Sequence, residues 1–266
     1  MTPTPSEYYT KSFYDEIRAG SLHSAEIILP LVLKLLPVRS LVDVGCCDGS
    51  WLSVARKLGV NDVLGMDGDH IDPASLQIPQ DCFQPMDLTK PFTLNRAFDL
   101  AISLEVAEHL PADSAAGFVE SLTRLAPVIL FSAAIPLQGG NHHLNEQWPE
   151  TWAQLFREHD FLLVDCIRKQ VWLNEAVEYW YAQNALLFVQ ADVLEASALL
   201  KAEFEQSNPA QLRLVHPRKY LELQSLYREA VFRAENPPPP SGVIAASRLL
   251  AVCLKNAVRK RLFGDP

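Results

Sequence analysis

An apolar strand that runs into a glycine-containing turn and then a helix constrains this chain most. Residues 41–44 read Leu-Val-Asp-Val, Gly45 and Gly49 follow, and a helix-like run begins at residue 50. Glycine permits the positive φ angles of tight turns, and its missing side chain lets the backbone approach a ligand closely. The pattern predicts an α/β fold that binds a nucleotide-derived ligand at the carboxyl ends of its strands.

The order of acid and glycines indicates which ligand is bound. Asp43 precedes the glycines, and the chain lacks a complete G-x-G-x-x-G fingerprint after this strand. An NAD(P)-dependent oxidoreductase shares the strand–turn–helix opening but is expected to carry that fingerprint. The sequence therefore favours S-adenosylmethionine over a dinucleotide.

Three further strand-like runs end close to an acid. Residues 63–67 end in Asp67, at a spacing suited to a carboxylate that accepts hydrogen bonds from ribose hydroxyls. Asp87 follows a third short run, and its carboxylate is suited to accept a hydrogen bond from the exocyclic amine of adenine. Residues 98–104 form a continuous apolar run, typical of a buried central strand, and deliver Glu105 to the same edge. These runs predict a doubly wound, mostly parallel sheet.

Taken together, these motifs resemble those of class I S-adenosylmethionine-dependent methyltransferases, particularly small stand-alone bacterial ones. The resemblance covers residues 10–192 and implies a seven-stranded Rossmann-like sheet, in which residues 166–172 and 185–190 are the last two strands. Trp180 and Tyr181, between these runs, either wall the acceptor side or pack in the core. The resemblance implies a set of cofactor-binding residues: Asp43, Gly45, Cys47, Gly49, Asp67, Gly68, Asp87, Leu88, Leu104 and Glu105.

One position departs from the family pattern. Cys47 stands where the D-x-G-x-G-x-G loop of these enzymes usually has its middle glycine. Two outcomes follow for the backbone: either residue 47 has an ordinary negative φ, or the loop is displaced. The substitution also raises a functional alternative, a non-catalytic binding module on a degenerate methyltransferase fold.

The segment from Glu105 to Pro111 carries the densest chemistry. If it turns helically, Glu105, Glu108 and His109 share one face. Carboxylates with an imidazole suit a divalent ion such as Mg²⁺, Mn²⁺ or Zn²⁺. The E-x-x-E-H pattern resembles the metal-binding one of small-RNA 2′-O-methyltransferases and ubiquinone-pathway enzymes. Two other interpretations stay open: His109 is a general base, or the segment only closes a turn.

A polar loop at residues 136–149 follows the fifth expected strand at residues 128–132. Its glycines and hydrogen-bonding side chains are typical of an acceptor-binding lid. His143 is a candidate second base or fourth metal ligand, beside side chains that we expect to orient a polar acceptor: Asn145, Glu146 and Trp148. Alternatively, the loop is an ordered connection in which Glu146 caps a helix that begins near Pro149.

Composition limits the partners of the chain. A net charge of −9 and a pI near 5.3 argue against nucleic-acid binding, which depends on Lys and Arg. The sequence shows no secretion leader and no long uncharged apolar run, so we expect a cytoplasmic protein. The cysteines lack C-x-x-C or zinc spacing, and we expect free thiols.

The chemistry of the candidate residues favours an O-methyltransferase that acts on a small molecule or glycan, because a hydroxyl must lose a proton as it is methylated. The expected catalytic residues are Glu108, His109 and His143, and an N-methyltransferase is the alternative. We expect a methyltransferase domain at 1–192, a helical extension at 193–236 and a proline linker with a basic tail helix at 237–266. Residues 243–263 of that tail either contact a membrane surface or a partner, or pack on their own domain.

Overall fold

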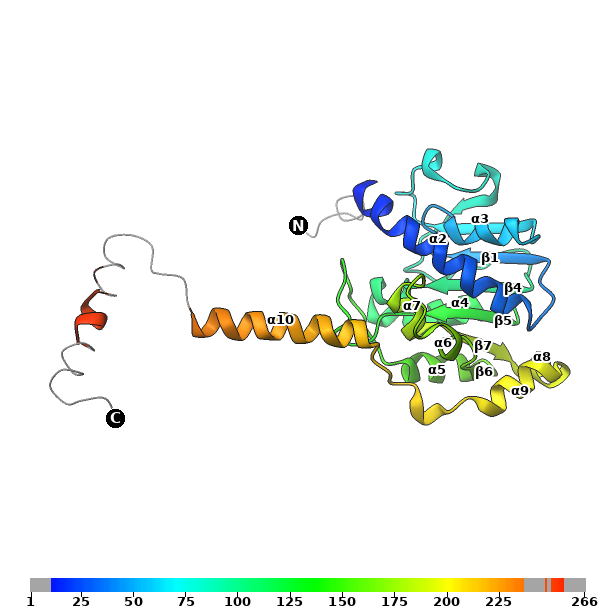
Figure 1. Ribbon diagram of the computed structural model, residues 1–266. Helices are drawn as coiled ribbons and strands as arrows, with labels where there is room; N and C mark the ends of the chain where they lie inside the picture. The colour runs from blue at the N-terminus through cyan, green and yellow to red at the C-terminus, as the bar shows by residue number, and fades with distance from the viewer. Residues whose placement is uncertain (1–10, 237–246, 248–249, 256–266) are drawn as a thin grey trace. The chain divides into compact units, whose positions relative to one another are not determined.

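A seven-stranded sheet forms the centre of residues 1–216 in the computed structural model (Figure 1). The structure describes residues 11–236, 247 and 250–255. The strands are β1 (Ser40–Val44), β2 (Asp62–Asp67), β3 (Phe83–Pro85), β4 (Leu100–Leu104), β5 (Val128–Ser132), β6 (Phe161–Val164) and β7 (Leu186–Gln190). Their order in the sheet is β3-β2-β1-β4-β5-β7-β6, which confirms the doubly wound, mostly parallel fold.

The pairing of the strands brings several carboxyl ends to one edge. β1 pairs in parallel with β2 on one side and β4 on the other, and β4 pairs in parallel with β5. β7 runs antiparallel to both β5 and β6. The residues that follow β1, β2, β4 and β5 therefore lie at the same edge of the sheet.

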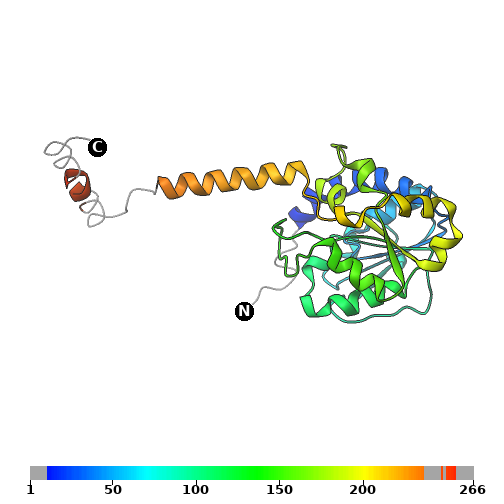
Figure 2. The ribbon, with the colours of Figure 1, turned by 90° about the horizontal axis from the view of Figure 1, so that it is seen from below.

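Helices cover both faces of this sheet (Figures 1 and 2). Among residues 11–216 the described α-helices are α2 (Lys11–Leu33), α3 (Ser50–Lys57), α4 (Ala115–Thr123), α5 (Pro149–Arg157), α6 (Arg168–Val171), α7 (Tyr179–Asn184), α8 (Ala191–Ala196) and α9 (Ala198–Gln206). Short 3₁₀ helices also occur in this described range: η1 (Pro73–Ser75), η2 (Gln80–Cys82), η3 (Ala107–His109), η4 (Ala112–Ser114) and η5 (Pro209–Gln211).

Two apolar clusters, one on each face, hold the layers together. Leu41 and Leu100 pack with α2, α3 and the helices after β6, whereas Val42 and Ala101 pack with α4 and α5. Every residue of β4 and β5 is buried. Burial on both faces explains why these strands read as continuous apolar runs rather than as alternating patterns.

The sixth strand differs from the prediction. It lies at Phe161–Val164, so the expected strand at 166–172 is wrong, whereas β7 confirms the run at 185–190. The stretch 166–172 contains α6 instead, because Ile167 and Val171, four residues apart, are both fully buried on one helical face. Short apolar runs do not by themselves distinguish a strand from a buried helical turn.

Residues 217–266 form a second unit, which contains α10 (Pro217–Glu235). The division expected at residue 192 stays a prediction, but Leu194 of α8 and Leu200 of α9 are buried in the core of the first unit. The expected tail helix at 243–263 lies mostly outside the described residues. Among the described helices, none is long and apolar enough to cross a membrane.

Candidate cofactor and acceptor site

A cavity of about 1010 Å³ lies where the loops after β1, β2, β3 and β4 meet the polar loop. All but one of the expected cofactor residues line it: Asp43, Gly45, Cys47, Asp67, Gly68, Asp87, Leu88, Leu104 and Glu105. Glu108, His109 and His143 line it as well. The cavity therefore joins the expected cofactor residues to the expected catalytic residues.

The turn after β1 depends on positive φ angles. Gly45 has a φ of 84°, and a Cβ atom there would lie 2.3 Å from Cγ2 of Val106. Gly49, the residue that does not line the cavity, has a φ of 78° and precedes α3. Cys47 has a φ of 51°, so the first of the two expected outcomes, an ordinary negative φ, is wrong. The cysteine takes the left-handed conformation that a glycine would adopt more easily.

Asp67 ends β2 and is anchored by two backbone amides. The N–H of Cys47 donates to Oδ2 over 2.8 Å, and the N–H of Gly68 donates to Oδ1 over 2.7 Å. Burial raises the pKa of Asp67, while these two hydrogen bonds oppose the shift. His70, which the sequence reasoning did not single out, lies 4.0 Å from the same carboxylate. The amides hold Asp67 at the cavity wall.

Asp87 lies in the loop that follows β3 and is half-exposed. Hydrogen bonds from Lys90 and Thr89 lower the pKa of Asp87 to about 2, so its carboxylate is ionised at neutral pH. Leu88 beside it is buried. An ionised acceptor next to an apolar side chain is chemically suited to the edge and the face of a purine ring.

Sequence reasoning missed an ion pair at the cavity. Nε of Arg18, from α2, donates to Oδ2 of Asp48 over 2.6 Å, and Oδ1 of Asp48 accepts from the N–H and hydroxyl of Ser50. Arg18 and Asp48 both line the cavity. Arg18 lies in α2, far upstream of the glycine turn in the sequence, and no local motif indicates that it reaches the cavity.

Glu105 follows β4 with a φ of 55°, and its carboxylate lies in a network of carboxamides. Nε2 of Gln138 donates to Oε2 over 2.8 Å, and Nδ2 of Asn184 donates to Oε1 over 3.0 Å. Gln183 donates in turn to Oε1 of Gln138 over 3.0 Å. Glu105 still lies beside Glu108, but amides bind its carboxylate, and its expected role as a metal ligand stays a prediction.

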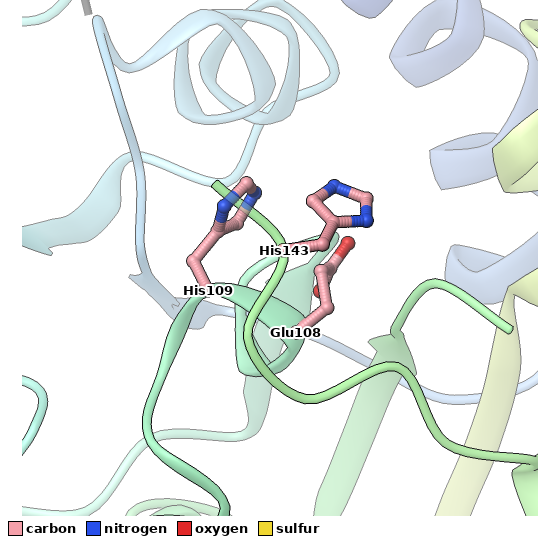
Figure 3. Close-up of side chains that lie close together, drawn as sticks. All are labelled: Glu108, His109 and His143. Atoms are coloured by element: carbon pink, nitrogen blue, oxygen red, sulfur yellow. The ribbon is translucent and has the colours of Figure 1, made fainter. Parts of the chain in front are cut away.

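Glu108, His109 and His143 do come together (Figure 3). One potential ligand atom from each lies within 4.8 Å of the others. Glu108 is fully buried, and its carboxyl oxygens make no well-formed hydrogen bond, although the backbone N–H groups of Glu108 and Ala134 and the carboxyl group of Glu105 lie near them. Burial, and then the neighbouring Glu105, raises the pKa of Glu108 well above its usual range. Burial, and then His143, lowers the pKa of His109 to about 4, so this imidazole is neutral at pH 7.

The donor set of this cluster does not suit magnesium, one of the divalent ions expected from the sequence. Magnesium prefers a near-octahedral shell of oxygen ligands, and this cluster offers one carboxyl group and two imidazoles, a combination that suits zinc better. The expected four-residue set is not assembled, because the cluster does not include Glu105.

The polar loop is organised by Glu146. Its carboxylate accepts from the N–H groups of Leu137 and Gly139, each over 2.7 Å, and lies 2.9 Å from Nδ1 of His143. The expectation that Glu146 caps α5 is wrong, because that helix begins after Trp148 with no side-chain cap. Three side chains expected to orient the acceptor are absent from the cavity lining: Asn145, Glu146 and Trp148.

Aromatic side chains of α7 complete the lining. Tyr179, Trp180 and Tyr181 all border the cavity. Tyr181 also packs edge-to-face on Trp51, with 5.2 Å between the ring centroids, and burial raises the pKa of its hydroxyl to about 12. Both interpretations of this segment therefore hold in part, since Tyr181 is a core residue that also borders the site.

The strand order, with β7 antiparallel between β5 and β6, and the cavity beside the glycine turn define a class I S-adenosylmethionine-dependent methyltransferase. The chain belongs to a family described as a methyltransferase domain, which matches residues 14–165, more than half of the chain. It is therefore a methyltransferase, and family membership implies S-adenosylmethionine as the methyl donor. No curated protein matches the chain.

Solved structures share the fold at low sequence identity. The sugar N-methyltransferase KedS8 from a Streptoalloteichus species has a TM-score of 0.54 at 14% identity, over 71% of this chain and 96% of that one. DesVI from Streptomyces venezuelae has a TM-score of 0.52 at 14% identity, over 72% and 100%. An O-methyltransferase family protein from Burkholderia thailandensis has a TM-score of 0.50 at 14% identity, over 67% and 57%.

Proposed function

We propose that this methyltransferase methylates a hydroxyl group of a small polar molecule, such as a sugar. The observation that carries the proposal is the cavity that joins the anchored Asp67 to the half-buried imidazoles of His109 and His143. Its volume of about 1010 Å³ is at the upper end of the range for small-molecule sites, so an acceptor has room beside the cofactor.

The cofactor lies, in this proposal, along the tips of β1 and β2. Asp67 accepts hydrogen bonds from the ribose hydroxyls, and Asp87 accepts one from the adenine amine. Gly45 leaves room for the methionine part next to the turn. Arg18, which is the one Lys or Arg side chain among the described lining residues, suits the cofactor's carboxylate.

The chemical step needs alignment and the removal of one proton. The acceptor oxygen attacks the methyl carbon, the carbon–sulfur bond breaks, and its electron pair stays on sulfur to give neutral S-adenosylhomocysteine. The hydroxyl proton passes to a neutral imidazole. Two imidazoles at the cavity, with edge-to-face rings 4.8 Å apart, support a hydroxyl as the acceptor, because a neutral amine needs no base to attack.

N-methylation is the second candidate, and one observation favours it. The buried carboxyl group of Glu108 makes no well-formed hydrogen bond and would accept one from an N–H of an amine acceptor. The structural neighbours are consistent with either outcome, since one is described as a sugar N-methyltransferase and another as an O-methyltransferase family protein.

The positive φ of Cys47 argues for an enzyme rather than a degenerate module, because the turn keeps a glycine-like conformation.

Titration calorimetry with S-adenosylhomocysteine tests the cofactor site first. We expect micromolar binding to the wild type and a loss of about tenfold to a hundredfold in Asp67→Ala, because hydrogen bonds to a charged group contribute about 1.5–3 kcal/mol. The exposed Asp113 provides a matched control, and Asp113→Ala should bind as the wild type does. An absence of binding to the wild type would contradict the proposal.

An acceptor screen then separates oxygen from nitrogen. Neutral sugars and amino sugars are incubated with the enzyme and isotopically labelled S-adenosylmethionine, and the methylated atom is located by mass spectrometry. Methylation of neutral sugars supports the hydroxyl proposal. Methylation of amino sugars alone, at nitrogen, would replace it with the second candidate.

A further inference from the structure

Glu146 and His143 form a hydrogen-bonded pair beside the cavity. Nδ1 of His143 lies 2.9 Å from Oε1 of Glu146, and the two side chains are 12% and 20% exposed. An ionised carboxylate accepts hydrogen bonds and does not donate them, so Nδ1 carries the proton in this pair. A neutral imidazole protonated at Nδ1 has its free lone pair on Nε2.

Glu146 is held in place independently of His143. Its Oε2 accepts from the N–H of Leu137 and its Oε1 accepts from the N–H of Gly139, both over 2.7 Å. Leu137 has a φ of 68°, a conformation that costs a residue other than glycine about 1–3 kcal/mol. The carboxylate therefore stabilises a strained turn and points at the histidine at the same time.

The other end of the loop is fixed to the segment after β4. The N–H groups of Leu144 and Asn145 donate to the carbonyl oxygen of Glu108 over 2.8 and 2.9 Å. His143 is therefore held between two anchored segments, with its ring against that of His109 (Figure 3). An imidazole positioned in this way is ordered before any acceptor binds.

The Nε2 edge of His143 lies against Gly140. A Cβ atom at Gly140 would lie only 2.3 Å from Nε2, so any larger residue would displace the ring. Gly140 and His143 line the cavity, whereas Glu146 does not. The carboxylate of Glu146 therefore binds Nδ1 of His143 without lining the cavity itself, whereas the ring of His143 does line the cavity.

We propose that Glu146 is a positioning residue, which fixes His143 as its Nδ1–H tautomer and so makes Nε2 of His143 the atom that accepts the proton from the methyl acceptor. This inference rests on the proposed function and deepens it, because it selects one of the two imidazoles. The proton leaves the acceptor hydroxyl as its oxygen bonds to the methyl carbon. The resulting imidazolium is stabilised by Glu146 and then returns its proton to solvent.

The chemistry of the two histidines supports this choice. Burial lowers the pKa of His109 to about 4, so His109 takes up a proton only at a considerable free-energy cost. The ring of His143 has a carboxylate as its hydrogen-bond partner, as in other carboxylate–histidine pairs in catalysis. In this arrangement His109 orders the ring of His143, and His143 manages the proton.

Nitrogen-15 NMR of the histidine rings tests the proposal without an acceptor. Spectra of the full chain are recorded at about pH 8, where an ordinary imidazole is neutral. The variant His143→Gln assigns the signal of His143 by its loss. We expect the wild type to show a protonated Nδ1 and an unprotonated Nε2, and Glu146→Gln to lose this signature because a carboxamide also donates to Nδ1.

Two further variants control this experiment. Glu146→Asp keeps the charge and should keep part of the Nδ1–H signature, whereas Glu158→Gln, at an exposed position after α5, should leave it unchanged. A protonated Nε2 in the wild type, or an unaltered signature in Glu146→Gln, would overturn the proposal. This result does not depend on cofactor binding, so a failure of S-adenosylhomocysteine to bind would contradict the proposed function alone.

Kinetics with the acceptor from the screen gives a second readout. Glu146→Gln and His143→Gln should each lower kcat by about a hundredfold or more, because replacing a carboxylate that orients a catalytic histidine can cost up to about ten-thousandfold in kcat. KM for S-adenosylmethionine should not change, because Glu146 lies outside the cavity lining. His143→Gln leaves the hydrogen bonds between Glu146 and the loop amides in place. An equal loss of kcat in both variants therefore indicates that Glu146 acts by positioning His143 and not only by holding the loop folded. Full activity in His143→Gln would overturn the assignment.

Discussion

The cofactor side and the acceptor side of the cavity are built differently. On the cofactor side, Asp67 comes directly after a strand, and neighbouring backbone amides of Cys47 and Gly68 bind it. On the acceptor side, Glu105 is bound by the side chains of Gln138 and Asn184, which come from two distant segments. Strand geometry thus sets the cofactor side, whereas contacts between separate loops and helices set the acceptor side.

The electrostatics of the acceptor side suit proton transfer. Glu108 is fully buried without a well-formed hydrogen bond, and burial lowers the pKa of His109 to about 4. Buried polar groups are usually satisfied, and perturbed pKa values cluster at functional sites. The acceptor side therefore buries polar groups at a free-energy cost that the packing of the fold does not explain. A bound acceptor can supply hydrogen-bond partners for these groups.

Gly45→Ala should have the largest effect, because Gly45 lies where the two sides touch. Its Cβ would lie 2.3 Å from Cγ2 of Val106, at a φ of 84°. We expect the free energy of unfolding, measured by urea denaturation, to fall by about 2–5 kcal/mol from backbone strain and overpacking together. Affinity for S-adenosylhomocysteine should fall with it.

Gly59 provides the matched control for this variant. It has a φ of 98°, and no atom lies within 4 Å of a Cβ built there. Gly59→Ala should therefore lose only the cost of the backbone strain, about 1–2 kcal/mol. Equal losses in the two variants would mean that contact between the cofactor turn and Val106 does not couple the two sides.

Asn184→Ala should have the next largest effect, and on the acceptor side. The variant removes a donor that serves both Oε1 of Glu105, over 3.0 Å, and Oε1 of Gln138, over 2.9 Å. Leaving buried acceptors without a donor costs about 1–3 kcal/mol, and more for a charged group. Urea denaturation should show a loss of about 2–3 kcal/mol, whereas Asn95→Ala at an exposed position should show almost none. A negligible loss would contradict a structural role for the network.

The cofactor side could be predicted from the sequence because its signals are local. A strand, a glycine turn and an acid at the next strand end are short patterns, and the residues they indicate do line the cavity. Gly49, one of the expected cofactor residues, does not line the cavity but adopts the positive φ at the start of α3. Arg18 was missed because it reaches the site from α2, with no pattern to connect it to the turn.

The acceptor side could be predicted only as a set of residues, not as a set of contacts. The sequence marks Glu105, Glu108, His109 and His143 as chemically important, but their partners depend on how the polar loop and α7 fold back. Glu105 is bound by amides, and Glu146 binds His143 rather than capping α5. The positive φ angles at Glu105 and Leu137, which shape these contacts, have no glycine to signal them.

Lowering the pH should reveal the burial of His109. Its pKa is about 4 in the folded protein and about 6.5 when unfolded, so the unfolded state binds more protons between these values. This contribution to stability is fully present above pH 6.5 and is lost as the pH falls towards 4. Between pH 7 and pH 5 the loss should be at most about 2 kcal/mol.

The variant His109→Gln isolates this contribution. Urea denaturation of the wild type and the variant at both pH values gives the difference that is due to His109. The wild type should lose more stability than the variant on acidification, because only the wild type carries the buried imidazole. An equal pH dependence in both proteins would show that His109 is not held in its neutral form.

Cys47→Gly should have the smallest effect, and it tests whether the unusual turn limits the cofactor side. Removing the side chain relieves the strain at a φ of 51°, but glycine also loses more backbone entropy on folding, so stability should change by less than about 1 kcal/mol. Because the cysteine already keeps the left-handed backbone, S-adenosylhomocysteine should bind within about threefold of the wild type in calorimetry. A tenfold or larger gain in affinity would mean that Cys47 weakens the cofactor site. In that case the cofactor side, which the local sequence determines, would be the impaired side of the cavity. The case for a non-catalytic module would then strengthen.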